Sequence, residues 1–248
     1  MDEQQTLTWD ALPSALGLAG SEVVSFVGGG GKTTSVFALA AHRPGRCIVT
    51  TTTKMGVDRT GGLPVLLAPS DDEIVAALDR NGAVLAWSGA DDRRGLGVEP
   101  ARCDHWATLA ETVAVEADGS RRRPFKAPRA YEPVVPASTT VLVACVGMAA
   151  VNAPIEVGCY RTDAVAALVG ASAKELLTPE RLVRVLLHRN GSRKGQPDQA
   201  RFAVLINRVT STDFAAVDEI RRRVRAHDPE ISVLAMADVE AGPLPGVR

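Results

Sequence analysis

The fold of this chain is decided by the stretch Val23-Val24-Ser25-Phe26-Val27-Gly28-Gly29-Gly30-Gly31-Lys32-Thr33-Thr34. A short apolar run leads into four consecutive glycines, which together cost about 2–4 kcal/mol of chain entropy relative to alanine. A generic turn would not offset this cost, so the loop must need bare backbone. Between a strand and a helix, the N–H groups of such a loop form a nest for an anion, and the helix N-terminus adds positive potential.

The same stretch has the pattern of a phosphate-binding loop of the Walker A kind. In such a loop the lysine, here Lys32, reaches the outer phosphates of a nucleotide, and the hydroxyl of Thr33 ligates Mg²⁺. One position departs from the pattern, because Phe26 stands where a glycine is usual. We expect the chain to bind ATP or GTP with Mg²⁺. The expected contacts are Gly28, Gly29, Gly30, Gly31, Lys32, Thr33 and Thr34.

Strand and helix patterns alternate along the rest of the chain. They predict strands at 23–27, 47–49, 63–67, 83–87, 112–116, 141–146, 202–206 and 231–235, and helices at 33–42, 71–79, 101–110, 162–169, 179–188 and 214–225. The run 141–146 is apolar throughout, which indicates a central strand covered on both faces. The sum predicts an α/β fold with a doubly wound, mostly parallel sheet, a three-layer sandwich like that of P-loop NTPases.

We expect a single domain over residues 1–248. Within it, residues 1–20 are expected to be an N-terminal extension and 239–248 a tail. The segments 119–136 and 190–199 lack regular patterns and are expected to be functional loops, because long loops in a compact domain usually serve a function.

Composition narrows the class of protein. The chain has 248 residues, 46% of them apolar and 23% charged, and a formal net charge of -1. No overall field would draw it to nucleic acid or to an anionic membrane. The longest apolar stretch, 141–151, is too short to span a bilayer, and no signal peptide is evident. We therefore expect a cytoplasmic protein without nucleic-acid or membrane partners, whose four cysteines are thiols.

Two further strand ends carry polar side chains toward the same sheet edge. The run Thr50-Thr51-Thr52-Thr53-Lys54 should face the phosphates, because the carboxyl ends of parallel strands line the ligand crevice. We single out Thr52 and Lys54 as nucleotide contacts. The strand Val113-Ala114-Val115 ends in Glu116-Ala117-Asp118-Gly119, the pattern of a Walker B strand that delivers a carboxylate to Mg²⁺. Spacing leaves open whether Glu116 or Asp118 serves the metal with Thr33.

The loop after this strand combines cations with prolines. Prolines at 124, 128 and 133 fix the backbone and predict a rigid, shaped loop. Only five of the 28 basic residues of the chain are lysines, and one of them, Lys126, stands in this loop together with Glu132. A lysine kept against an arginine-rich background suits a compact point charge. We expect Lys126 to stabilise developing charge, as a catalytic residue beside Lys32, Glu116 and Asp118.

A last strand end bears on the nucleotide base. Asn207-Arg208-Val209-Thr210 occupies the place where many P-loop GTPases carry Asn-Lys-x-Asp for guanine. Asn207 is present and is a candidate nucleotide contact. Thr210 replaces the aspartate that would read guanine, so the choice between ATP and GTP stays open.

Taken together, these motifs resemble the YqeC family of selenium-dependent (molybdenum) hydroxylase accessory proteins. The resemblance covers about residues 20 to 237. It rests on the segments 26–34 and 50–55, on Glu116-Ala117-Asp118-Gly119, on the loop from Lys126-Ala127-Pro128 to Glu132-Pro133, and on 191–197 with Lys194-Gly195. It implies a P-loop nucleoside triphosphatase fold and a role in maturing molybdenum hydroxylases, through selenium or the molybdopterin cofactor.

The sequence therefore predicts a Mg²⁺-dependent nucleoside triphosphatase that acts as an accessory factor for a molybdenum hydroxylase. Two alternatives stay open. A small-molecule kinase would hold its acceptor under the loop 119–136, and a non-catalytic, nucleotide-gated chaperone would bind an apo-enzyme.

Overall fold

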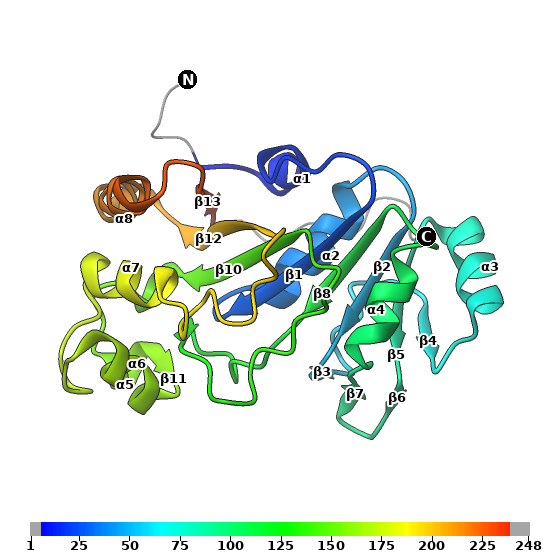
Figure 1. Cartoon of the computed structure of the whole chain (residues 1–248), viewed down its shortest axis with the longest axis horizontal. Coiled ribbons are helices and arrows are strands. Elements are labelled where there is room, and N and C mark those ends of the chain that lie inside the picture. The colour runs from blue at the N-terminus through cyan, green and yellow to red at the C-terminus, as the bar shows by residue number, and fades with distance from the viewer. Residues whose placement is uncertain (1–5, 239–248) are drawn as a thin grey trace.

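The computed structural model describes residues 6–238 and is built around one parallel sheet (Figure 1). Its eight strands lie in the order β13-β12-β10-β1-β8-β2-β5-β4, and all of its neighbouring strands pair in parallel. The strands are β1 (Glu22–Gly28), β2 (Cys47–Thr51), β4 (Val65–Leu67), β5 (Ala83–Trp87), β8 (Thr112–Glu116), β10 (Val141–Gly147), β12 (Arg201–Val209) and β13 (Ser232–Ala237).

The sheet is covered by helices on both faces. The helical elements are η1 (Trp9–Ala11), α1 (Leu12–Ala15), α2 (Lys32–His42), α3 (Asp71–Asn81), α4 (Pro100–Trp106), η2 (Met148–Ala150), α5 (Ile155–Gly158), α6 (Thr162–Val169), α7 (Pro179–Leu187), η3 (Ser211–Asp213) and α8 (Phe214–His227). One hydrophobic core joins the sheet to η1, α1 and α2, and a second joins its other face to α3, α4, α6, α7 and α8. Successive strand residues alternate between the cores: Val23 and Val27 belong to one, Val24 and Phe26 to the other. The three-layer α/β sandwich predicted from the sequence is confirmed.

The strand order places a ligand crevice at the carboxyl end of β1. Strands that follow β1 in the chain lie first on the β8 side of it, and from β10 onward on the other side. In doubly wound sheets, ligands bind outside the carboxyl ends of the strands where this order reverses. The glycine loop therefore leaves the sheet at the expected switch point. The long apolar run β10 is buried throughout and lies between β1 and β12, as predicted.

Most predicted elements are present with small shifts of their ends, and β5, β8 and α6 have the predicted bounds. Sequence patterns missed the short strands. A three-stranded antiparallel sheet consists of β3 (Lys54–Gly56), β6 (Gly89–Ala90) and β7 (Arg94–Leu96), and β9 (Phe125–Lys126) pairs with β11 (Cys159–Tyr160). Two or three residues show no periodicity, and their pairing is decided by distant parts of the chain.

The N-terminal segment is part of the core. Trp9, Leu12 and Leu16 are buried and pack with α2, so the described part of the expected extension covers the sheet. The expected tail at 239–248 lies outside the described residues. All four cysteines are buried and unpaired, and burial raises the pKa of each thiol to about 12. Within residues 6–238, none of the helices has the length and apolarity that crossing a bilayer requires.

Candidate functional site

The glycine loop joins β1 to α2 in a conformation that side chains oppose. Gly28, Gly30 and Gly31 have φ angles of 92°, 69° and 112°, in the left-handed region that favours glycine. A Cβ atom on Gly30 would lie 2.2 Å from the backbone nitrogen of Gly147 and 2.7 Å from the carbonyl oxygen of Pro124. The loop is therefore packed against backbone on its outer side, and bare glycine is required there.

Two amides of this loop already donate hydrogen bonds to backbone carbonyl groups. The Gly29 amide donates to the carbonyl oxygen of Cys145 at 3.1 Å, and the Gly30 amide donates to that of Arg123 at 3.1 Å. The next four amides, of residues 31–34, donate no hydrogen bond to any group within residues 6–238. They form the N-terminus of α2, so a row of free donors and the helix dipole coincide there. The structure thus offers four amides, rather than the whole loop, to an anion.

The side chain of Lys32 reaches back to the carboxyl end of β1. Its side chain is buried, and its Nζ donates to the carbonyl oxygen of Gly28 at 2.6 Å. The same atom lies 3.2 Å from Asp118 Oδ1 and 4.0 Å from Glu116 Oε1. Burial acts to lower the pKa of Lys32, but the two carboxylates outweigh it and the pKa is raised. Lys32 is therefore an ammonium ion at neutral pH.

The structure separates the two acids that the sequence left equivalent. Glu116 ends β8, the neighbour of β1, and its Oε2 accepts a hydrogen bond from Thr33 Oγ1 at 2.8 Å. Asp118 follows the strand end, and its Oδ2 accepts from the Gly28 amide at 3.1 Å. Its buried Oδ1 accepts no hydrogen bond, although Lys32 lies beside it.

A magnesium ion suits these donors. Mg²⁺ is usually held by one or two carboxylates together with phosphate oxygens and waters. Glu116 and the Thr33 hydroxyl lie together at the helix N-terminus, which fits this donor set. Among residues 6–238, no three histidine, cysteine or acidic side chains lie together as a metal-binding cluster.

Burial of Glu116 gives a pH-dependent stability that can be measured. Desolvation raises the pKa of Glu116 above its usual 4.5, although Lys32 and Thr33 oppose the shift. A carboxyl whose folded pKa is raised holds its proton longer in the folded state, so this group reduces stability as pH rises from 4.5 through the raised pKa. Glu116→Gln removes this loss. We expect the variant to gain stability relative to the wild type as pH increases from 4 through the raised pKa of Glu116, in urea unfolding. A constant difference across that range would contradict the assignment.

A row of alternating charges continues from Lys32 toward the surface. Lys126 Nζ lies 3.1 Å from Asp118 Oδ2, pairs with Glu132 Oε2 and donates to the carbonyl oxygen of Gly119 at 2.9 Å. Arg161 Nη2 in turn lies 2.8 Å from Glu132 Oε1. We call Glu116, Lys32, Asp118, Lys126, Glu132 and Arg161 the charge row. Burial would raise the pKa of Glu132, but Lys126 and Arg161 hold it lower than usual.

The two expected functional loops meet over the charge row. Lys194 Nζ donates to the carbonyl oxygens of Arg129 and Ala130, at 2.5 and 2.8 Å. Beneath them is a cavity of about 10 Å³, room for about one water molecule. Its lining residues are Val27, Gly28, Asp118, Lys126, Pro128, Pro133, Gly191 and Ser192. Both loops thus cover the charged centre.

The threonine run mainly ties the sheet edge together. The hydroxyls of Thr50, Thr51 and Thr52 donate to the carbonyl oxygens of Ala86, Glu116 and Val134. Lys54 is exposed in β3, where it pairs with Leu96, and within residues 6–238 no hydrogen bond or ion pair joins it to the glycine loop. The structure brings Thr52 to the proline-rich loop and does not bring Lys54 to the site, because the chain turns away after Thr51 into a separate antiparallel sheet.

Asn207 contacts the glycine loop directly. Its Nδ2 donates to the carbonyl oxygen of Gly30 at 2.7 Å, and its buried Oδ1 has no hydrogen-bond partner. A Cβ on Gly31 would lie 2.6 Å from Asn207 Nδ2. Thr210 is exposed and caps η3 through Asp213. Asn207 therefore supports the loop and keeps one acceptor free beside it.

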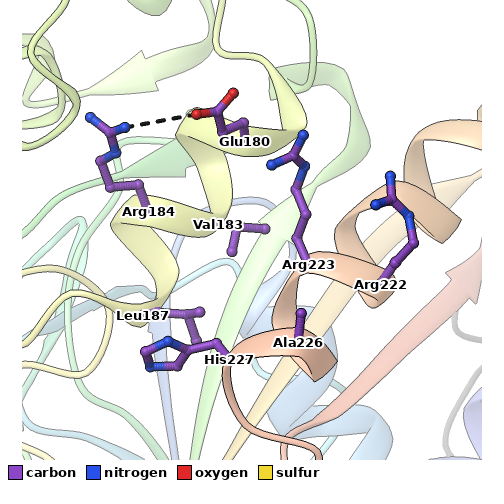
Figure 2. Close-up of a pocket in the computed structure, with 8 residues that line it drawn as sticks. All are labelled: Glu180, Val183, Arg184, Leu187, Arg222, Arg223, Ala226 and His227. Carbon is purple, nitrogen blue, oxygen red and sulfur yellow. Dashed lines mark ion pairs between the residues drawn. The ribbon is translucent and has the colours of Figure 1, made fainter.

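Sequence reasoning missed Arg161, which follows β11 with a φ of 60°. No motif surrounds it, and only the pairing of β9 with β11 brings it to Glu132. A larger groove of about 410 Å³ lies elsewhere, between α7 and α8 (Figure 2). The arginines of this groove form ion pairs with glutamates of their own helices: Arg184 pairs with Glu180, and both Arg222 and Arg223 pair with Glu219.

Comparisons with known proteins agree with the motifs. The model of the YqeC protein family matches residues 24–163, which contain the glycine loop, the Glu116 strand and the whole charge row. The chain is also 28% identical over 231 residues to the uncharacterized protein YqeC of Escherichia coli (strain K12), covering 89% of each chain. No solved structure matches the chain significantly. The matched region spans more than half of the chain, and the protein therefore belongs to the YqeC family.

Proposed function

We propose that this protein binds a nucleoside triphosphate with Mg²⁺ and hydrolyses it. One observation carries the proposal: four free amides of α2, the buried Lys32 ammonium and the Thr33–Glu116 pair converge at the carboxyl end of β1. Amides at a helix N-terminus bind phosphate oxygens, and a lysine at this position contacts the outer phosphates.

The residues divide the work by their contacts. Residues 31–34 would hold phosphate oxygens, and Lys32 would exchange its contacts with Gly28 and Asp118 for the outer phosphates. Thr33 and Glu116 would hold Mg²⁺, with Asp118 close enough to position one of its waters. The ion would neutralise phosphate charge. Lys126, held by Asp118 and Glu132, is the cation available on the opposite side of Asp118.

The test removes the ammonium of Lys32. We expect Lys32→Ala to weaken binding of Mg²⁺–ATP or Mg²⁺–GTP by about 10- to 100-fold in calorimetry, because a hydrogen bond to a charged group contributes about 1.5–3 kcal/mol. The exposed Lys174→Ala is the matched control. Since Lys32 also neutralises buried acids, Lys32→Arg is measured in parallel and circular dichroism verifies folding. Unchanged affinity in a folded Lys32→Ala protein would refute the proposal, and the better of the two ligands identifies the base.

A phosphotransferase is the second candidate, and the covered position of Lys126 favours it. A loop that closes over a cation beside Asp118 could exclude water and admit an acceptor. Phosphate release that needs no added acceptor would support hydrolysis, whereas turnover only with an acceptor would support transfer.

We further propose that this nucleotide chemistry serves the maturation of a molybdenum hydroxylase, with or without selenium. The family resemblance supports this role. The test is co-purification of a tagged chain with such an enzyme. We expect recovery of the partner to depend on Mg²⁺–nucleotide and to fail with Lys32→Ala, and equal recovery in all conditions would contradict a nucleotide-controlled role.

A further inference from the structure

Three cations converge on one aromatic ring at the outer end of the charge row. Tyr160 lies in β11, directly opposite Lys126 of β9. Arg161 Cζ lies 4.4 Å from the centroid of the Tyr160 ring, Arg121 Cζ 5.5 Å and Lys126 Nζ 5.8 Å. A tyrosine face attracts one cation. Three cations at one ring repel each other and need anions nearby.

Acidic side chains in the structure do not balance this cluster. Lys126 and Arg161 share Glu132, and Lys126 also pairs with Asp118. Arg121 is exposed and forms no ion pair or hydrogen bond within residues 6–238. The Nε of Arg161 is buried and has no hydrogen-bond partner there. The whole guanidinium of Arg121 is thus free for an anion, and one buried donor of Arg161 lacks a partner.

The backbone holds both arginines in a conformation that costs energy. Arg121 and Arg161 have φ angles of 48° and 60°, in the left-handed region that non-glycine residues rarely adopt. Such strain collects at binding sites, where the surrounding structure maintains it. Tyr131 completes the surface: it is 66% exposed, and its hydroxyl accepts a hydrogen bond from Arg161 Nη2 at 3.0 Å. An exposed aromatic ring therefore lies next to Arg161.

We propose that Arg121, Arg161 and Tyr131 bind the phosphate group of a small-molecule second substrate. Arginine recognises phosphate through paired donors, which a cluster of guanidiniums provides. The assignment of this site to a second substrate rests on the proposed function, because Lys126 connects the cluster to Asp118 and, through Asp118, to Lys32. Binding of the phosphate itself does not depend on a nucleotide.

The chain supplies its own reporters for a test. Its only two tyrosines are Tyr131 and Tyr160, so protein labelled at tyrosine with ¹³C gives two sets of ring signals. Tyr131→Phe assigns them. The full-length protein is titrated with inorganic phosphate at constant ionic strength, with sodium acetate and sodium chloride in separate arms. The titration is repeated in Lys32→Ala, in which we expect phosphate binding at the glycine loop to be weaker.

We expect both tyrosine signals to shift and saturate with phosphate, in the wild type and in Lys32→Ala alike. Arg121→Gln should weaken this binding by about tenfold, as loss of one charged hydrogen-bonding group predicts. Arg161→Lys, which keeps the charge but removes the paired donors, should weaken it as well. Arg80→Gln, an exposed arginine of α3 at the other end of the sheet, is the matched control (Figure 1).

Each outcome decides the proposal. Absence of saturable shifts with phosphate, equal response to acetate or chloride, or a normal response in Arg121→Gln would overturn it. If phosphate shifts the signals through Arg121 while calorimetry finds no nucleotide binding, the anion site stands and the proposed function fails. If nucleotide binds but phosphate leaves both signals unmoved, the proposed function stands and the anion site fails.

Discussion

Lys126→Met is expected to destabilise the protein by about 3–5 kcal/mol, the usual cost of removing one partner from a buried ion pair. Lys126 is 1% exposed and is the common partner of Asp118 and Glu132. Methionine fills a similar volume, so the loss reports the missing cation rather than an empty space: Asp118 keeps only Lys32, and Glu132 keeps only Arg161. Urea unfolding measures the change, and Lys174→Met at an exposed position is the control, expected to be neutral.

A second variant separates charge from packing. In Lys126→Met/Glu132→Gln, position 132 no longer carries a charge that needs a cation, and Asp118 keeps Lys32 at 3.2 Å. We expect the double variant to recover a large part of the lost stability. If Lys126→Met alone is as stable as the wild type, the charge row does not form in solution. If the double variant is no more stable than the single one, packing and not charge explains the loss.

Gly30→Ala should have the next largest effect, and on both stability and binding. Its φ of 69° strains any side chain, and the new Cβ would meet backbone atoms of Gly147 and Pro124, which cannot rotate away. Left-handed strain and overpacking together cost about 2–5 kcal/mol. The loop must move to relieve the contact, so we also expect loss of nucleotide binding.

The structure offers a matched control for this substitution. Gly119 lies in the same site, but a Cβ added there would meet nothing within 4 Å, and its φ is not left-handed. We expect Gly119→Ala to change stability little. Urea unfolding and calorimetry compare the two variants. A Gly30→Ala protein as stable as Gly119→Ala would show that the glycine loop adopts another conformation in solution.

Local sequence patterns predicted some of the polar side chains of the site and misplaced one other. Lys32, Thr33 and Glu116 were predicted from local motifs, and the structure brings them together because β1 and β8 are hydrogen-bonded neighbours. Lys54 was predicted by the same rule of strand ends, yet the chain leaves the sheet before it. The rule applies only to residues at the carboxyl end of a strand. Where a strand ends depends on the strands that pair with it.

Other members of the site have no local signal at all. Arg161 reaches Glu132 through a two-residue strand pair, and Asn207 reaches Gly30 across the sheet. The carbonyl groups of Arg123 and Cys145 accept hydrogen bonds from two loop amides, and any residue could supply such backbone atoms. Such contacts depend on how segments meet in space, and a pattern along the chain does not contain that information.

By itself, the sequence determined the parallel α/β sandwich, the glycine loop at the end of β1 and the acidic strand end beside it. These features are local: apolar periodicity, glycine's freedom of φ and the residues that follow a strand all act over a few neighbouring positions. Only the tertiary structure decided that Glu116 pairs with Thr33 while Asp118 lies between two lysines. That choice arises from burial and charge balance among segments up to about a hundred residues apart, because a buried charge is stable only where an opposite charge is folded against it.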